Sequence, residues 1–207
     1  MKIVISLFLT FLCSSNVSAQ NEAQFLSMIH RLEAANNESD YVVANDQLEQ
    51  LAFAYPANWL TQYYAALGRA IMSTKGFDIN ETNINKAIQY LIRTKQCKIN
   101  DEVLCLESFV YSVKMSKAPF ARWLLYKNQI MHPLEMAQKI NSNNPRIYIL
   151  QASIHKNIPT WLGGGCDAAS PYIKLAIKKW STLHLSSIQP HWGEGTLDNL
   201  KKSCPID

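Results

Sequence analysis

The sequence contains few of the residues that break regular structure and few charged side chains. Among its 207 residues are only seven Gly and eight Pro, and 17% are Asp, Glu, Lys or Arg. This composition excludes a collagen-like repeat, a disordered polymer and a long coiled coil. Hydrophobic residues make up 48% of the chain, so a chain of this length can bury a sizeable core in one domain.

Motifs for metals, nucleotides and nucleic acids are also missing. The formal net charge is only +4, and like charges do not cluster in long runs, so nucleic acid and anionic membrane are poor partners. The five histidines are scattered, and neither a Cys-x-x-Cys nor a His-x-x-x-His spacing occurs. We therefore expect no metal, no cofactor, no nucleic-acid partner and no enzymatic activity.

The longest hydrophobic run lies at the N-terminus. Lys2 precedes an apolar run from Ile3 to Cys13, and Val17-Ser18-Ala19 supplies the small residues after which signal peptidase cleaves. A membrane span needs about twenty apolar residues, which this run does not reach. We predict that residues 1–19 are a secretory signal and that residues 20–207 form a single domain in the periplasm or outside a Gram-negative cell. The alternative is a lipoprotein lipidated at Cys13.

Apolar residues recur at helical spacing along the rest of the chain, and the alternation typical of strands is almost absent. Breakers such as Pro56, Pro119 and Pro145 fall between the apolar stripes and not inside them. Helices joined by short connections pack as antiparallel hairpins. We predict an all-α fold of about four such hairpins plus a C-terminal capping helix near 195–204. The hairpins are expected at about 22–55, 57–96, 101–141 and 144–184.

The spacing of the hairpins favours a tetratricopeptide-like right-handed array, whose units are helix-turn-helix pairs of about 34 residues. Two segments, Tyr55–Trp59 and Asn143–Tyr148, have the Pro that opens the next unit of such a repeat. Ala44 and Gly68 lie near positions where these repeats use small residues. Extra residues around 73–83 and 117–133 make the repeat degenerate.

The C-terminal third also resembles a more specific group. The segments that carry the resemblance are Asn144-Pro145-Arg146-Ile147-Tyr148, Gly163-Gly164-Gly165, Ala169-Ser170-Pro171 and Pro190-His191-Trp192-Gly193. In this order they resemble a family of secreted bacterial tetratricopeptide-like proteins of about this length. The resemblance implies an export signal, an all-helical array and no established enzymatic activity.

The glycine triplet at residues 163–165 has two interpretations. Consecutive Gly before a helix can present backbone N–H groups to a phosphate or carboxylate. The alternative, which we favour, is a tight turn in which Asp167 caps the following helix and Pro171 lies in its first turn.

Four cysteines remain after the signal: Cys97, Cys105, Cys166 and Cys204. An even number in an oxidising compartment favours disulfides, and Cys97–Cys105 with Cys166–Cys204 is the pairing we expect. Free thiols are the alternative, because sequence separation does not give Cα distances. A minor alternative is that Cys166 is a nucleophile at a helix N-terminus, with His155 or His191 as its base.

Five Trp and nine Tyr are many for this length, and helical spacing favours burying most of them. The alternative is a ligand or partner surface, since protein interfaces favour Tyr and Trp. We expect the loop 187–194 to fold Trp192 onto the last hairpin as a plug. The candidate surface comprises Tyr63, Tyr64, Tyr148, Trp161, Gly163, Gly164, Gly165, His191 and Trp192.

The predicted architecture favours a protein that acts by binding, because stacked hairpins present extended surfaces. Our first hypothesis is an exported scaffold that binds another envelope or secreted protein. The alternative is a periplasmic protein that binds a small apolar ligand or assists a transporter. A distant resemblance to the tetratricopeptide-type partner of TRAP transporters, in its Gly-rich turn, suggests the transporter role.

Overall fold

The computed structural model describes residues 19–184 and 188–205, and within these ranges it contains helices and no strand. Most of the predicted signal segment, including Cys13, lies outside the described residues. No described helix has both the length and the apolar character that a membrane crossing requires. The α-helices are α1 (Ala19–Ala34), α2 (Glu38–Ala54), α3 (Trp59–Thr74), α4 (Thr82–Cys97), α5 (Asp101–Ser116), α6 (Pro119–Ile140), α7 (Pro145–Asn157), α8 (Cys166–Trp180) and α9 (Glu194–Ser203). Two short 3-10 turns are η1 (Ile79–Glu81) and η2 (Thr160–Leu162).

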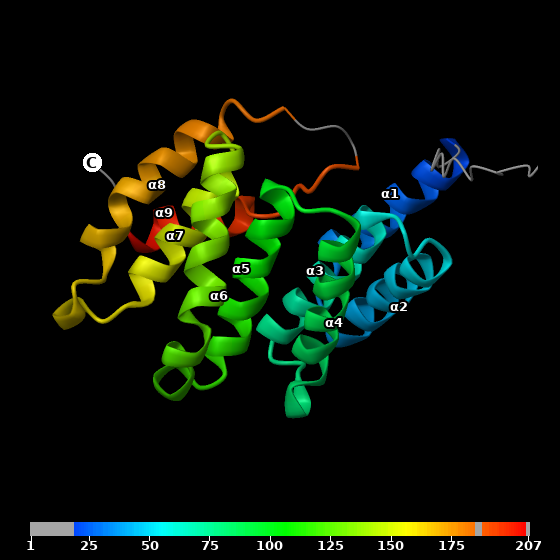
Figure 1. The fold of residues 1–207 in the computed structure, drawn as a ribbon, viewed down its shortest axis with the longest axis horizontal. Helices are drawn as coiled ribbons and strands as arrows, with labels where there is room; N and C mark the ends of the chain where they lie inside the picture. The colour runs from blue at the N-terminus through cyan, green and yellow to red at the C-terminus, as the bar shows by residue number, and fades with distance from the viewer. Residues whose placement is uncertain (1–18, 185–187, 206–207) are drawn as a thin grey trace, which may run out of the picture.

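Successive helices pack as pairs, and the pairs follow one another along the molecule (Figure 1). The pairs α1–α2, α3–α4, α5–α6 and α7–α8 correspond to the four predicted hairpins, and α9 corresponds to the predicted capping helix. α9 packs against α7 and α8. The all-α prediction is therefore confirmed, whereas the right-handed tetratricopeptide-like geometry stays a prediction.

Asparagine side chains fix the starts of four helices. The side-chain oxygens of Asn37, Asn58, Asn100 and Asn144 accept hydrogen bonds from backbone amides two or three residues ahead. Each bond satisfies an amide that has no partner within the helix, and such a cap contributes about 1 kcal/mol. Pro145 follows Asn144 at the first helical position, where its missing N–H costs nothing.

The buried apolar side chains form two clusters that meet at α5. Val103, Leu106 and Val110 of α5 belong to the cluster that α1–α4 complete. Leu104 and Cys105 belong to the second cluster, with α6–α9. Partly buried Phe109 and Trp192 pack against both clusters, and Trp192 comes from the segment just before α9. The C-terminal segment therefore reaches the junction between the two halves of the core.

Helices α2 and α3 cross closely, as the small residues predicted. A Cβ on Gly68 would lie 2.3 Å from Asn45 Oδ1, so any larger residue at this crossing would force the buried Asn45 side chain to move. Beside it, Arg69 of α3 donates to Glu49 of α2 at 2.7 Å and to Asp46 at 3.1 Å. Burial alone would raise the pKa of the Glu49 carboxyl. The hydrogen bonds and positive charges of Arg69 and Lys86 together outweigh burial, so the pKa lies below its ordinary value.

Candidate functional site

The chain covers one of its own faces with a short segment. Residues 188–193, called the strap below, run beside α3, α5 and α7 and lead into α9 (Figure 1). Three helices position the side chains that hold the strap: Tyr63 and Tyr64 on α3, Phe109 on α5, and Arg146 on α7. Together with Glu102 of α5, these residues are called the strap-covered face below.

Side chains of the strap-covered face donate to backbone carbonyls of the strap. The Tyr64 hydroxyl donates to the Gln189 carbonyl at 3.0 Å, and the Arg146 guanidinium donates to the Pro190 carbonyl. In the opposite direction, Trp192 Nε1 donates to the Tyr63 hydroxyl at 2.6 Å. The Trp192 ring also lies 5.3 Å from the Phe109 ring, centroid to centroid. The strap is thus anchored through its main chain at two points and through one aromatic side chain.

A buried ion pair lies under the strap. Arg146 Nη1 donates to Glu102 Oε1 at 3.0 Å, and the Arg146 side chain is fully inaccessible to solvent. The guanidinium is flanked by the rings of Trp180 and Trp192, at 5.8 and 5.6 Å from the ring centroids. Asn144 Nδ2 adds a hydrogen bond of 2.8 Å to the same carboxylate oxygen.

The electrostatics of this pair are unbalanced. Burial raises the pKa of the Glu102 carboxyl to about 7, and the attraction of Arg146 offsets only part of that shift. Glu102 Oε2 and Arg146 Nε have no hydrogen-bond partner among the described residues. Such incompletely satisfied buried polar groups weaken a network, because each one gave up water without full replacement.

The structure brings together only some of the candidate surface residues. Tyr63 and Tyr64 are buried and meet the strap, so Trp192 and its neighbour His191 lie with them. Burial raises the pKa of both phenols, which keeps them protonated. Trp192 packs on α3 and α5 as well as beside Arg146, so the expected plug reaches further than the last hairpin.

Tyr148, Trp161 and the three glycines at residues 163–165 lie elsewhere in the structure. Tyr148 is also buried, but its hydroxyl donates to the Ser142 carbonyl and not to the strap. Trp161 stands in η2 with 78% of its surface exposed. The nine candidates therefore do not form one surface.

Glu102 and Arg146 were not among the predicted site residues. The sequence placed Arg146 only in a turn motif. Ile149 and Leu150, one turn further along α7, are apolar, and both are buried. A charged residue one turn before buried apolar residues needs a buried partner of opposite sign, which was the available signal. Glu102 gave a weaker signal, because an acidic residue in the first turn of α5 also suits a helix N-terminus.

The glycine triplet is a tight turn. The amides of Gly163, Gly164 and Gly165 donate to the carbonyls of Thr160, Pro159 and His155, so these N–H groups already have acceptors. A Cβ on Gly164 would lie 2.1 Å from the Ile158 carbonyl oxygen. The backbone N–H groups are thus not directed at an anion. The predicted cap is corrected: α8 begins at Cys166 after Gly165, which makes no side-chain capping bond, and Asp167 lies inside the first turn. Pro171, which was expected in the first turn, lies further inside the helix.

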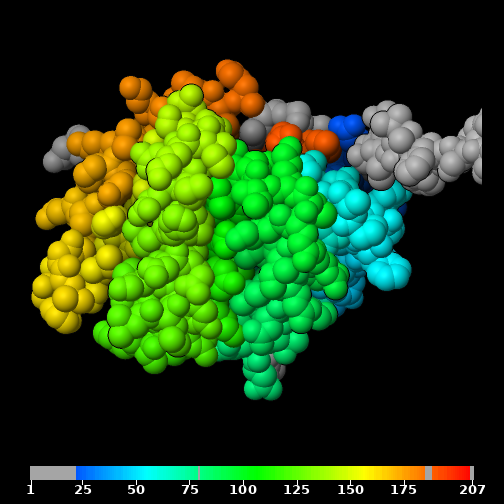
Figure 2. Space-filling model, viewed as in Figure 1, coloured from blue at the N-terminus to red at the C-terminus, as the bar shows by residue number. Residues whose placement is uncertain are grey.

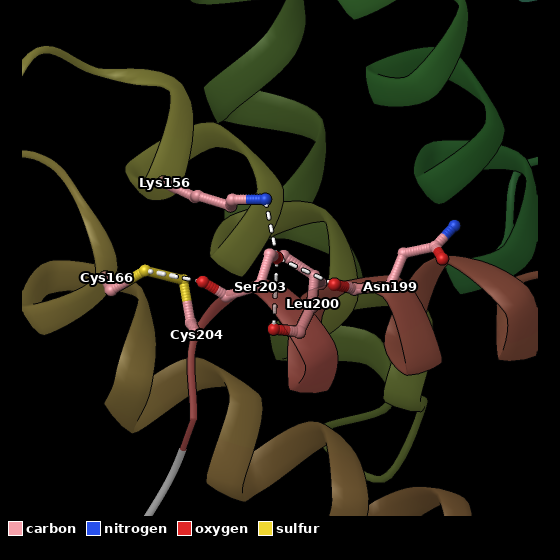
Figure 3. Close-up of a disulfide and its surroundings, with 6 residues drawn as sticks. All are labelled: Lys156, Cys166, Asn199, Leu200, Ser203 and Cys204. Atoms are coloured by element: carbon pink, nitrogen blue, oxygen red, sulfur yellow. Dashed lines mark hydrogen bonds between the residues drawn. A yellow bond between two sulfur atoms is a disulfide. The ribbon is translucent and has the colours of Figure 1, made fainter.

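One predicted disulfide is present and the other is not. Cys166 and Cys204 are bonded, with their Cα atoms 5.2 Å apart, and the bond joins the start of α8 to the end of α9 (Figure 3). Cys97 and Cys105 are free thiols: Cys97 is exposed at the end of α4, and Cys105 is buried inside the second core cluster. Since the Cys166 sulfur is in a disulfide, Cys166 is not a nucleophile in this state.

Three strongly exposed apolar side chains lie close together on the first half of α6. Phe120, Leu124 and Leu125 have 89%, 77% and 66% of their surfaces exposed, and with half-buried Trp123 they are called the α6 apolar surface below. Figure 2 shows the side of α6 turned to the viewer with no other helix in front of it. Lys127, one turn after Trp123 and Leu124, is exposed and has no ion pair among the described residues.

Helix lengths explain why this surface is uncovered. α6 has 22 residues, whereas α7, the helix that follows it, has 13. At 1.5 Å per residue, α6 is longer than α7 by roughly 13 Å. The chain turns back after Ile140, so α7 meets α6 near the turn that joins them and packs chiefly against α8. Ile130, Leu134 and Ala137 of the second half are buried, whereas residues 119–129 are exposed or half-buried.

The described residues contain no group of His, Cys, Asp and Glu side chains that could hold a metal ion. The α6 apolar surface provides exposed rings and aliphatic groups beside a free ammonium group. The strap-covered face provides hydroxyl and guanidinium donors, but the strap occupies them.

The fold and these two regions define a class: an all-helical hairpin protein with one face closed by its own chain and an apolar surface left open. No protein-family model matches the chain, and no curated protein matches it significantly. Among solved structures, the chain is similar to the HusA haemophore from Porphyromonas gingivalis, with a TM-score of 0.77 and 24% sequence identity. The similarity covers 89% of this chain and 92% of the haemophore chain, and it shows a shared fold.

Proposed function

We propose that the chain is a non-catalytic binding protein for a flat, largely apolar ligand that carries acidic groups, a chemistry that haem represents. The observation that carries this proposal is the α6 apolar surface, where three apolar side chains within six residues each have at least 66% of their surface exposed. Contiguous exposed apolar patches on soluble proteins commonly mark interaction or ligand-binding sites. The shared fold with a protein named as a haemophore supports the same ligand class.

The side chains of the α6 apolar surface suit such a ligand. Phe120 and Leu124 are one helical turn apart, and Trp123 adjoins both, so they form a contiguous apolar strip. A ligand that covers these side chains removes their apolar surface from water, which stabilises the complex by about 25 cal/mol per Å² of buried apolar area. Lys127 adjoins the strip and would pair with a carboxylate such as a haem propionate. The strip therefore accounts for both the apolar and the acidic part of the ligand.

Export is part of the proposal. The N-terminal sequence predicts a secretory signal, and the Cys166–Cys204 disulfide supports an oxidising compartment, because cytosolic proteins seldom keep such bonds. A binder of this kind would meet its ligand in the periplasm or outside the cell.

A titration with haemin, followed by absorbance, tests the site. We expect Phe120→Ser and Leu124→Ser each to weaken haemin binding by about tenfold, since each removes a side chain whose burial is worth about 1.5–3 kcal/mol. Phe53→Ser is the matched control, because Phe53 on α2 is 88% exposed against 89% for Phe120. We expect it to leave the affinity within about twofold of wild type.

The same titration can contradict the proposal in two ways. If the chain does not bind haemin more tightly than a control protein that lacks such an apolar surface, the ligand class is wrong. If haemin binds but Phe53→Ser weakens it as much as Phe120→Ser, then binding is non-specific and the α6 apolar surface is not the site. If haemin does bind at the α6 apolar surface, the same titration with iron-free protoporphyrin shows whether apolar contact or iron coordination dominates the affinity, because this ligand retains the macrocycle and the propionates.

The second candidate function is the scaffold that binds another envelope or secreted protein. Exposed Trp161 and Leu162 in η2, 78% and 60% exposed, favour it, because interfaces are enriched in such anchors. This candidate predicts that Trp161→Ala reduces recovery of a partner in a pull-down from the periplasmic fraction, while haemin binding is unchanged. The transporter-accessory hypothesis stays a prediction to be examined with the same variants.

A further inference from the structure

The Cys166–Cys204 disulfide and the strap belong to one covalent loop. The two cysteines are 38 residues apart, and the chain between them contains α8, the strap and α9 in that order. The loop is therefore closed at the far end of α9, so the disulfide limits how far α9, and the strap that leads into it, can move away from α7 and α8.

The strap itself is held by bonds that water can replace. Its anchoring carbonyls, on Gln189 and Pro190, accept from the side chains of Tyr64 and Arg146 and not from a backbone ladder. The remaining anchors are the hydrogen bond from Trp192 to Tyr63 and the contact of Trp192 with Phe109. A segment of this kind opens more readily than a helix or a strand in a sheet, since its opening breaks few main-chain bonds.

α9 depends on its links to the rest of the molecule. It has ten residues, and isolated helices shorter than about 12–15 residues are marginal in water. Leu197 and Leu200 bury its apolar side, and Lys156 Nζ of α7 donates to Ser203 Oγ at 2.6 Å (Figure 3). The disulfide is the covalent part of this attachment, one residue beyond Ser203.

We infer that the Cys166–Cys204 disulfide is a latch that keeps the strap closed over the strap-covered face, and that its reduction lets the strap lift. The opened face would present the hydroxyls of Tyr63 and Tyr64 and the guanidinium of Arg146. This inference does not rest on the proposed haem-type function, because the α6 apolar surface lies outside the covalent loop.

The chemical step is thiol–disulfide exchange with a dithiol reductant. A thiolate of the reductant attacks a sulfur of the disulfide, most accessibly at Cys166, because Cys166 is exposed whereas Cys204 is buried. The S–S bond breaks and a mixed disulfide forms, which the second thiol of the reductant then resolves. The protein gains two thiols, two electrons and two protons, and the dithiol becomes a disulfide.

Tyrosine nitration with tetranitromethane, mapped by peptide mass, reads the state of the strap. Free thiols are alkylated first, so that Cys97 does not consume the reagent. Tyr63 and Tyr64 report on the strap, exposed Tyr55 is the positive control, and Tyr148, which is buried and bonded to Ser142, reports on unfolding of the C-terminal half. The chains compared are wild type, the double variant Cys166→Ser with Cys204→Ser, and Cys97→Ser as the matched control.

We expect the double variant to raise the nitration rate of Tyr64 at least about tenfold, because removing a disulfide releases a chain-entropy constraint on the open form. Tyr148 should remain protected, and Cys97→Ser should behave as wild type. Wild type that is reduced with dithiothreitol, alkylated and freed of the reductant before nitration should give the same increase. A sample that is reduced and then reoxidised before alkylation should react as untreated wild type does.

Two results would overturn the inference. If Tyr64 is as protected without the disulfide as with it, the strap does not need the latch. If Tyr64 and Tyr148 become reactive together, the disulfide stabilises the whole C-terminal half and does not control the strap alone.

Discussion

Two regions of the molecule contain clustered aromatic side chains, and they differ in what covers them. On the strap-covered face, Tyr63 and Tyr64 are buried, and Trp192 donates to Tyr63. On the α6 apolar surface, Phe120 is 89% exposed and meets no covering element. The difference arises from chain connectivity: a C-terminal segment returns over one region, whereas α7 is too short to cover the other. Aromatic content alone therefore does not locate a binding site.

The comparison predicts that substitutions on the closed face cost stability, with the largest cost at the buried ion pair. Arg146→Ala would leave the Glu102 carboxyl buried without its partner and would remove the donor to Pro190. We expect a loss of about 3–5 kcal/mol in the free energy of unfolding, measured by urea denaturation. Arg93→Ala is the control, because exposed Arg93 only lies over the Tyr90 ring, and it should cost less than about 1 kcal/mol. Equal losses for both variants would mean that the ion pair is not special.

The pKa of Glu102 gives the closed face a pH dependence. In the unfolded chain this carboxyl has the ordinary value of 4.5, and in the fold burial raises it to about 7. The folded state therefore binds the proton more tightly. This contribution to stability is fully present below the unfolded pKa, and it is lost as the pH rises through about 7.

Urea denaturation between about pH 5 and about pH 8 measures this effect. Wild type should lose stability over that range relative to Glu102→Gln, whose amide does not ionise, by roughly 3 kcal/mol at most. Arg146 opposes the shift and Asp101 adds to it, so the size of the step depends on both. Parallel pH profiles for the two chains would show that Glu102 does not titrate in this range.

Trp192→Phe tests the strap with a smaller effect. The substitution keeps an aromatic ring near Phe109 but removes the N–H that donates to the Tyr63 hydroxyl. We expect a loss of about 1–2 kcal/mol in the free energy of unfolding, because Tyr63 is left with an unpaired buried hydroxyl. Trp161→Phe, at an exposed position, is the matched control and should be neutral. If the two variants unfold at the same urea concentration, the strap contributes little to stability.

Most of the fold was predictable from the sequence. The apolar stripe of Ile84, Ala87 and Leu91 repeats at helical spacing, and all three residues are buried. Pro145 also marked the first turn of α7, and Pro56 marked the turn between α2 and α3. Pro133 and Pro171, however, lie inside α6 and α8, so proline alone did not mark every boundary. Residues close together in the sequence determine these features, so they can be predicted from one sequence alone.

The candidate sites were less predictable, because they depend on contacts between distant parts of the chain. Tyr64 and Gln189 are 125 residues apart, and no local pattern pairs them. The Cys166–Cys204 bond was expected and is present, whereas the expected Cys97–Cys105 bond is absent, because closeness in sequence does not bring two cysteines into bonding geometry. The α6 apolar surface was missed, because its exposure follows from the short length of α7 and not from its own sequence.

The open surface should respond to substitution in the opposite way to the closed face. Phe120 is 89% exposed, so Phe120→Ser removes little packing and should change the free energy of unfolding by less than about 0.5 kcal/mol. The same variant should nevertheless weaken haemin binding, whereas Arg146→Ala should lower stability without a direct effect on that site. Measuring urea denaturation and haemin titration on both variants tests this separation. A large stability loss for Phe120→Ser would mean that α6 is covered in solution, and the contrast between the two regions would then disappear.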